Sequence, residues 1–253
     1  ENATDSGDMR ASGRTSRGLV REANEDAFLR ADDVRLFVVA DGMGGHAAGE
    51  VASRLAIETL AEELASLPPA TPGPDVEAAL RRAVQAANRA ILERAAREPD
   101  KAGMGTTLTA LRIVEQDDGA PGYRIAHVGD SRAYRLRAGT LELLTRDHTW
   151  VQLEVERGTL TPELARVHPF ASVLVRAVGI EPEAEPDLLR GRIEPGDLYL
   201  LCSDGLTTAL EDRELKDLLD ATAPLQPLAR RLVDAANERG GPDNITVVLL
   251  RAA

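Results

Sequence analysis

The segment TTLTALRIVEQDDGAPGYRIAHVGDSRAYRLRAGTLELL, residues 106–144, contains four short apolar runs in close succession. Short runs of this kind, separated by turn residues, are typical of β-strands joined into hairpins. We place the strands at Thr106–Val114, Tyr123–Val128, Arg132–Leu136 and Leu141–Leu144, with turns at Gly129–Ser131 and Ala138–Gly139. The segment therefore predicts an antiparallel sheet.

Helical and further strand patterns lie on both sides of this segment. Apolar residues recur at helical spacing over 47–67, 76–97, 213–219 and 227–238, with a Pro-rich stretch, Pro68–Pro74, after the first. Short apolar runs predict strands at 35–40, 173–178, 198–202 and 245–250. The stretch 149–166 is charged and only weakly amphipathic. This order indicates an α+β fold in which helices cover an antiparallel core.

The composition fits a globular protein that does not bind nucleic acid. The chain has 253 residues, 43% of them hydrophobic, which is enough for one large core. We interpret residues 1–12 as a disordered N-terminus and 13–253 as a single domain. A net charge of -12 repels phosphate backbones and anionic lipid, and an aromatic content of 3% leaves little to stack on bases.

The sequence also bears on the cellular environment. Cys202 is the single cysteine, which excludes a disulfide framework and a thiolate zinc site and favours a reducing compartment. No run reaches the roughly 18 apolar residues that a membrane span needs, so we expect a soluble, monomeric, cytoplasmic protein. Because the sequence begins at Glu1 rather than Met, it also fits the cytosolic domain of a longer protein.

Four aspartates adjoin apolar strands at turns: Asp41, Asp130, Asp204 and Asp243. Taken one at a time, each fits ordinary turn chemistry. If the strands share one core, however, their ends can bring the carboxylates together, and the repulsion would be costly without a cation. An all-oxygen ligand set selects Mg²⁺ or Mn²⁺ over zinc, and the four scattered histidines form no competing motif.

Seven segments resemble, in order, the motif series of the PP2C (PPM) family of metal-dependent protein phosphatases, particularly its bacterial branch. They are SRGLVREANEDAF (16–28), VVADGMGGHAAGEVAS (38–53), GTTLTAL (105–111), AHVGDSRAYRL (126–136), LTRDHTW (144–150), LCSDGL (201–206) and GPDNITVVLL (241–250). Asp-Gly and Gly-Asp-Ser are common on their own. The resemblance is specific because all seven occur in the family's order over nearly the whole chain.

The resemblance implies two packed antiparallel sheets flanked by helices, a four-layer αββα sandwich with a binuclear Mn²⁺ or Mg²⁺ centre at one end. In the family pattern, Asp41 bridges the two metals and the backbone carbonyl of Gly42 binds one of them. Asp204 and Asp243 complete the other site. Glu25 matches a carboxylate at the second metal, which it holds directly or through water.

Three more residues have supporting positions in the family pattern. Asp130, together with Asp204, matches the pair that holds a third, weaker metal in bacterial members. Asp26 lies beside Glu25, and Asn244 is expected to orient Asp243 from behind the metal centre.

The implied activity is hydrolysis of phosphoserine and phosphothreonine in proteins by direct attack of a metal-bridging water. Arg21 stands where the family places its phosphate-binding arginine, and a guanidinium can grip two phosphoryl oxygens at once. We therefore regard Arg21, Asp41 and Asp204 as the catalytic residues. The implied partners are phosphorylated proteins, among them Ser/Thr kinases that this phosphatase would oppose and the substrates of those kinases.

Some assignments stay open on the sequence alone. Many eukaryotic members have histidine after the metal-binding Asp-Gly, where this chain has Met43, so the general acid is either His46 or a metal-bound water. The flap region, about 149–172, either steers peptide substrates or is a surface loop without a role in selectivity. For His148 we expect a structural hydrogen bond.

Two other classes of function compete with the enzyme. A catalytically silent module that binds phosphoproteins would be favoured by the loss of a core carboxylate. A Ca²⁺-binding acidic domain would need no arginine at the site. Because every expected carboxylate and Arg21 are present, the sequence favours the phosphatase.

Overall fold

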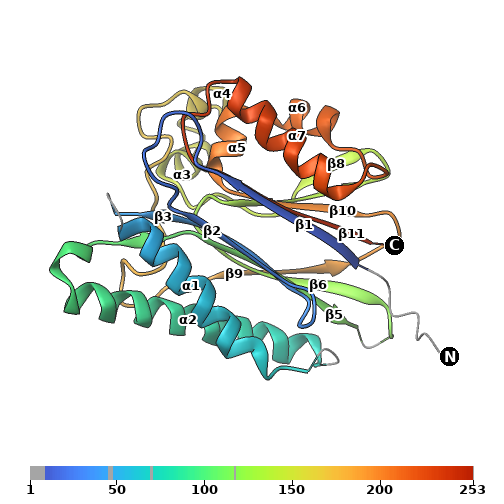
Figure 1. Cartoon of the computed structure of the whole chain (residues 1–253), viewed down its shortest axis with the longest axis horizontal. Coiled ribbons are helices and arrows are strands. Elements are labelled where there is room, and N and C mark those ends of the chain that lie inside the picture. The colour runs from blue at the N-terminus through green and yellow to red at the C-terminus, as the bar shows by residue number, and fades with distance from the viewer. Residues whose placement is uncertain (1–8, 45–47, 69–70, 117, 253) are drawn as a thin grey trace.

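Two antiparallel β-sheets pack face to face between two layers of helices (Figure 1). The structure is a computed structural model that describes residues 9–44, 48–68, 71–116 and 118–252. The expected αββα sandwich is confirmed.

The two sheets draw their strands from both halves of the chain. In the first sheet the order is β1-β11-β10-β7-β8, formed by β1 (Met9–Ser16), β7 (Arg132–Arg137), β8 (Thr140–Leu143), β10 (Leu198–Cys202) and β11 (Ile245–Ala252). In the second the order is β2-β3-β5-β6-β9, formed by β2 (Asp26–Ala31), β3 (Leu36–Met43), β5 (Leu108–Glu115), β6 (Pro121–Val128) and β9 (Asp187–Arg192), while β4 (Gly105–Thr106) pairs with the end of β3.

The helices cover the two outer faces of the sandwich (Figure 1). The second sheet is covered by α1 (Ala48–Ala65) and α2 (Gly73–Arg97), which is followed by a short 3-10 turn at Pro99–Lys101. The first sheet is covered by α5 (Asp204–Ala209), α6 (Asp212–Leu218) and α7 (Leu225–Glu238). Two short helices, α3 (Trp150–Glu156) and α4 (Pro162–Arg166), lie in the expected flap region.

Three apolar layers hold the sandwich together because the strands are buried on both faces. Leu60 and Leu80 pack under the second sheet, and Leu232 packs over the first. Between the sheets lie side chains such as Phe37 and Tyr199. No helix within the described residues combines the length and apolar character that a membrane span needs.

The turn Gly129–Ser131 differs from the hairpin that the sequence predicts. It carries the chain from β6 in the second sheet to β7 in the first, so the two strands do not pair. Gly129 has φ +105°, and a Cβ there would lie 2.6 Å from Cβ of Thr107. The apolar pattern could not reveal this crossover, because a strand buried on both faces looks the same in either sheet.

Two other expectations need correction. The prediction of disorder over 1–12 is wrong for Met9–Ser12, which belong to β1, while residues 1–8 lie outside the described residues. As an edge strand paired only with β11, β1 leaves Arg10 and Arg14 exposed and therefore lacks an apolar run. The predicted strand at 173–178 forms only isolated bridges at Leu174 and Val178.

Candidate metal centre and active site

A pocket of about 280 Å³ lies where the loops at one end of the sandwich meet. Eight of the nine residues predicted for the site line it: Arg21, Glu25, Asp41, Gly42, Asp130, Asp204, Asp243 and Asn244. The ninth, Asp26, does not line the pocket. The remaining lining residues are Met43, Gly44, Thr107, Ser172 and Leu174.

The four aspartates meet because the chain reaches this end of the sandwich four times. Asp41 lies near the end of strand β3, and Asp130 lies in the crossover between the sheets. Asp204 begins α5 directly after β10, and Asp243 precedes β11, which pairs with β10. The ends of strands from both sheets thus place their carboxylates around one pocket.

Burial makes this cluster electrostatically unfavourable. Desolvation, followed by repulsion from neighbouring aspartates, raises the pKa of Asp41 and of Asp130 well above the ordinary value. Desolvation and the charge of Asp243 raise the pKa of Asp204 to about 6. The carboxyl groups of Asp41 and Asp204 lie within hydrogen-bonding reach of each other. A bound cation would relieve the repulsion.

The donor set fits hard divalent cations. Oδ1 of Asp204 is buried and receives no hydrogen bond from the described residues. Within that part of the chain, no group of three or more His, Cys, Asp or Glu side chains is already arranged to hold a metal ion. Asp41 and Asp204 instead lie against each other, and Asp243 binds Arg21. Filling the site would therefore require these side chains to exchange those contacts for the ion.

Gly42 is held so closely that no side chain fits. Its amide donates to the Glu25 carbonyl at 3.1 Å, and an added Cβ would clash with the backbone carbonyl of Gly49. Thr107 fixes the neighbouring residue, because its hydroxyl accepts from the Asp41 amide at 2.9 Å. The backbone at Asp41–Gly42 is therefore rigidly placed at the pocket wall.

Asp26 lies behind the pocket, opposite Asp41 in the register of β2 and β3. Its Oδ2 accepts from the Ser203 hydroxyl at 2.7 Å, whereas its buried Oδ1 has no partner among the described residues. Desolvation raises its pKa to about 7. The position fits the supporting role predicted for it.

Asn244 holds Asp243 through its backbone. The Asn244 amide donates to Oδ1 of the Asp243 carboxylate at 2.8 Å. The side chain holds the loop that carries Arg21 and Glu25. Its Oδ1 accepts from the Glu25 amide at 2.8 Å, and its Nδ2 donates to the carbonyls of Arg17 and Ala23, each at 2.9 Å.

Arg21 reaches into the pocket from this loop. Its Nη2 lies 2.7 Å from Oδ2 of Asp243, and this bond raises the pKa of the guanidinium. About half of the side chain, 52%, remains exposed. The arginine is therefore available at the pocket wall to an anion entering from solvent.

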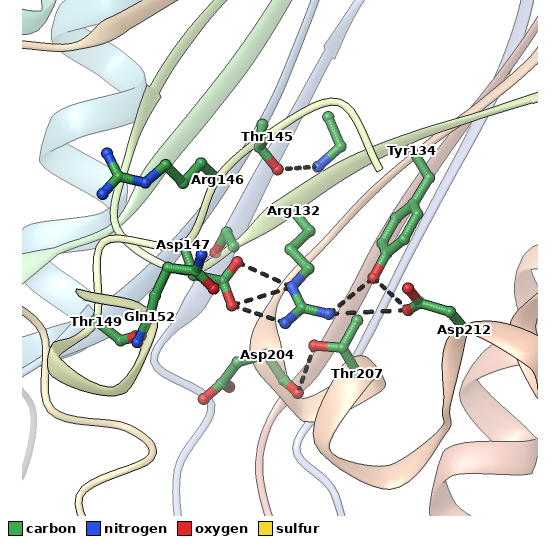
Figure 2. A network of polar contacts seen from close by, with 12 residues as sticks. Arg132, Tyr134, Thr145, Arg146, Asp147, Thr149, Gln152, Asp204, Thr207 and Asp212 are labelled. Atoms are coloured by element: carbon green, nitrogen blue, oxygen red, sulfur yellow. Dashed lines mark hydrogen bonds and ion pairs between the residues drawn. The ribbon is translucent and has the colours of Figure 1, made fainter. Parts of the chain in front are cut away.

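A polar network lies beside Asp204 (Figure 2). Arg132 binds the Asp147 carboxylate through Nε and Nη2, at 2.9 and 2.7 Å. Its Nη1 donates to the Tyr134 hydroxyl, which donates to Asp212 at the start of α6. The network ties β7, the stretch before α3 and α6 together next to the pocket.

Sequence reasoning missed several contributors. Thr107 and Ser131, whose hydroxyls are 2.7 Å apart, support the loops of Asp41 and Asp130, although both lie in motifs already recognised. Ser172 and Leu174 bring the flap region to the pocket, and only the fold shows this. The structural hydrogen bond expected for His148 is confirmed. His46 lies outside the described residues.

The ordered motifs and the geometry of the pocket agree with a family comparison. The model for protein phosphatase 2C matches residues 15–249. The chain belongs to the protein phosphatase 2C family. That assignment covers both sheets, both helix layers and every residue that lines the pocket.

Two bacterial relatives within protein phosphatase 2C are similar to this chain over nearly its whole length. The serine/threonine protein phosphatase PstP of Mycobacterium tuberculosis is 45% identical over 241 residues, which are 95% of this chain and 44% of PstP. The chain thus spans less than half of that relative's length. The serine/threonine phosphatase stp of Listeria welshimeri is 39% identical over 96% of this chain and 95% of its own.

A solved structure shows the metal content of one relative. It is the catalytic domain of PstP in complex with 2 manganese ions, with a TM-score of 0.84 and 43% identity, covering 97% of this chain and 98% of that chain.

Proposed function

We propose that this protein phosphatase 2C chain is a metal-dependent phosphoprotein phosphatase acting on phosphoserine and phosphothreonine. The observation that carries the proposal is the convergence of Glu25, Asp41, Asp130, Asp204 and Asp243 with one arginine in a single pocket. A cluster of buried and half-buried carboxylates fits cations, and the arginine fits a phosphoryl group. The two manganese ions in the PstP structure support the choice of metal.

The residues of the pocket would bind either the cations or the phosphoryl group. Asp41, Asp204 and Asp243 would hold two cations together with Glu25 and the Gly42 carbonyl, while Asp130 and Asp204 would hold a third, weaker one. When bound, such ions lower the pKa of water and offset charge on phosphoryl oxygens. Arg21 holds the phosphoryl group in line for attack. Met43 lines the pocket but carries no proton to give, so the proton for the leaving oxygen would come from His46 or from water at the metal centre.

The partners we propose are phosphorylated proteins, including the Ser/Thr kinases that the enzyme would oppose. The relatives named serine/threonine phosphatases support this substrate class. Either Mn²⁺ or Mg²⁺ satisfies the oxygen ligands, and we expect Mn²⁺ to support the faster turnover.

The test is phosphate release from a phosphothreonine peptide with Mn²⁺, with Mg²⁺ and with chelator. We expect turnover with both metals and none after chelation. A folded protein that releases no phosphate with either metal would overturn the proposal and favour a phosphoprotein-binding module. Binding of the same peptide without turnover, measured by calorimetry, would identify that module.

Replacing Arg21 by alanine is expected to lower kcat/KM on the order of 10²-fold, because the transition state loses a preorganised charge. Stability should change little, since Arg21 is half exposed and surface ion pairs contribute about 0 to 1 kcal/mol. Steady-state kinetics with the peptide measures the effect. Arg14→Ala, an exposed arginine on β1 outside the pocket, is the matched control. Equal rates for Arg21→Ala and wild type would exclude a phosphate-binding role.

A further inference from the structure

His148 forms two hydrogen bonds with the crossover turn that carries Asp130. The Gly129 amide donates to Nδ1 of the His148 ring at 3.1 Å, and the His148 amide donates to the Gly129 carbonyl at 2.8 Å. Both polar backbone groups of Gly129 are therefore bound by one residue. The ring is buried, with 1% of the side chain exposed.

These contacts determine which ring nitrogen carries the proton. An amide N–H can only donate, so Nδ1 must accept and is unprotonated. The proton of the neutral ring is then on Nε2, which donates to Oδ2 of Asp187 at 3.1 Å. The other oxygen of Asp187 accepts from Arg176 at 2.9 Å. Asp187 thus fixes both the tautomer and the orientation of His148.

Other contacts fix the position of His148 in the chain. The preceding residue, Asp147, is held by the two bonds from Arg132 (Figure 2). The His148 carbonyl accepts from the Val175 amide at 2.8 Å, at the end of the flap region. The residue is therefore anchored on both sides of its backbone, and its ring points at the turn.

On its far side, the turn is held through Ser131. The Thr107 and Ser131 hydroxyls share a hydrogen bond of 2.7 Å, and the Thr109 hydroxyl donates to the Ser131 carbonyl at 3.1 Å. Asp130 lies between these two supports. Gly129 itself has a positive φ that few residues adopt, so the turn depends on its hydrogen bonds to keep this shape.

We propose that His148, oriented by Asp187, is a positioning residue that holds the Gly129–Asp130 turn so that the Asp130 carboxylate faces the pocket. The expected effect on cation binding rests on the proposed function. The hydrogen bonds between His148 and Gly129 can be tested without it. Loss of the Nδ1 acceptor would leave the Gly129 amide buried without a partner and let the turn relax. Asp130 would then hold a cation less well.

Two substitutions separate the two ring nitrogens. In His148→Asn, the side-chain oxygen can accept near the position of Nδ1, but the side chain is too short to reach Asp187. In His148→Gln, the amide nitrogen can donate near the position of Nε2, but nothing accepts from Gly129. Both variants are neutral and remove the same ring, but each keeps only one of its two bonds. A rise in exchange at Gly129 that is confined to His148→Gln therefore reports the bond to the turn and not the bond to Asp187.

Asn88→Leu is the matched control. The Asn88 side chain is fully buried on α2; its Oδ1 accepts from the Gly179 amide at 2.6 Å and its Nδ2 donates to the Glu181 carbonyl at 2.9 Å. The variant loses the buried acceptor of another glycine amide without touching Gly129, Ser131 or Thr109. A loss of general stability would therefore appear in this control as well.

The first readout is hydrogen exchange of the Gly129 amide, followed by NMR in chelator without substrate. We expect His148→Gln to exchange this amide at least tenfold faster than His148→Asn, with the control near wild type. The second readout is calorimetric titration with Mn²⁺. We expect the weakest resolved affinity to fall about 10- to 100-fold in His148→Gln, the range typical of residues that orient ligands.

Equal exchange rates in His148→Asn and His148→Gln would overturn the proposal, and so would a control that loses Mn²⁺ affinity to the same extent. Failure of the phosphatase function would show differently, as an inactive wild-type protein in which the two His148 variants still differ at the Gly129 amide.

Discussion

Replacing Asp204 by asparagine is expected to abolish metal-dependent phosphate release, with a loss on the order of 10³-fold or more. Asp204 contacts Asp41, adjoins Asp130 electrostatically and carries a buried oxygen without a hydrogen-bond donor among the described residues. The Asp204 carboxylate is thus placed to bind more than one cation. Asparagine keeps the size of the side chain but removes its charge and one strong ligand oxygen.

The same substitution should stabilise the protein in chelator. Because the pKa of Asp204 is raised to about 6, the ionised side chain destabilises the metal-free fold near neutral pH. Steady-state assays with a phosphothreonine peptide and urea unfolding in chelator measure the two effects. Asp217→Asn, an exposed charge on α6, is the control for losing one negative charge. Retention of more than a tenth of the wild-type activity by Asp204→Asn would exclude its role in the metal centre.

Much of the fold could be predicted because burial leaves a pattern in the sequence. The run Leu198–Cys202 forms a strand with the predicted bounds, since every residue in it is buried. The helices α1 and α7 follow their apolar periodicity for the same reason. Strands β2 and β9 gave no such signal, because their residues are mostly half-buried and polar and apolar types mix.

The candidate site could be predicted residue by residue only through the motif series. Carboxylates at strand ends indicated oxygen ligands, but Glu25 and Arg21 were recognised by spacing alone. The physical support of the site was not accessible. The bonds from Asn244 to the loop of Arg21 span more than 200 positions of sequence, and the His148 ring joins the segment before α3 to the crossover turn between the sheets. Such contacts depend on topology, which periodicity does not encode.

Metal removal should make stability fall as the pH rises from 6.5 to 8. The pKa of Asp26 is raised to about 7, and those of Asp41 and Asp130 are raised well above 3.8, in each case first by desolvation. The folded state therefore holds protons that the unfolded state has lost. Stability from such groups is complete below the unfolded pKa and is lost as the pH passes the folded pKa.

The choice of pH window matters because His127 acts in the opposite direction. Desolvation lowers its pKa to about 4 and also lowers the pKa of His148, so the stability from both histidines increases with pH and levels off just above the unfolded pKa of about 6.5. Above pH 6.5 the histidines oppose the aspartates only weakly, and the aspartates dominate the slope.

In chelator, urea unfolding should give a free energy about 2 kcal/mol lower at pH 8 than at pH 6.5, since one unit of pKa corresponds to about 1.4 kcal/mol. Saturating Mn²⁺ should remove this loss, because a cation that binds only the ionised carboxylates stabilises the fold more as they deprotonate. In chelator, Asp26→Asn should make the unfolding free energy fall less steeply with pH. The difference from wild type measures the contribution of Asp26, which lies behind the pocket, apart from that of the aspartates that line it. A stability that rises with pH in chelator over this window would contradict the clustering of buried carboxyl groups, on which the whole account of the metal centre depends.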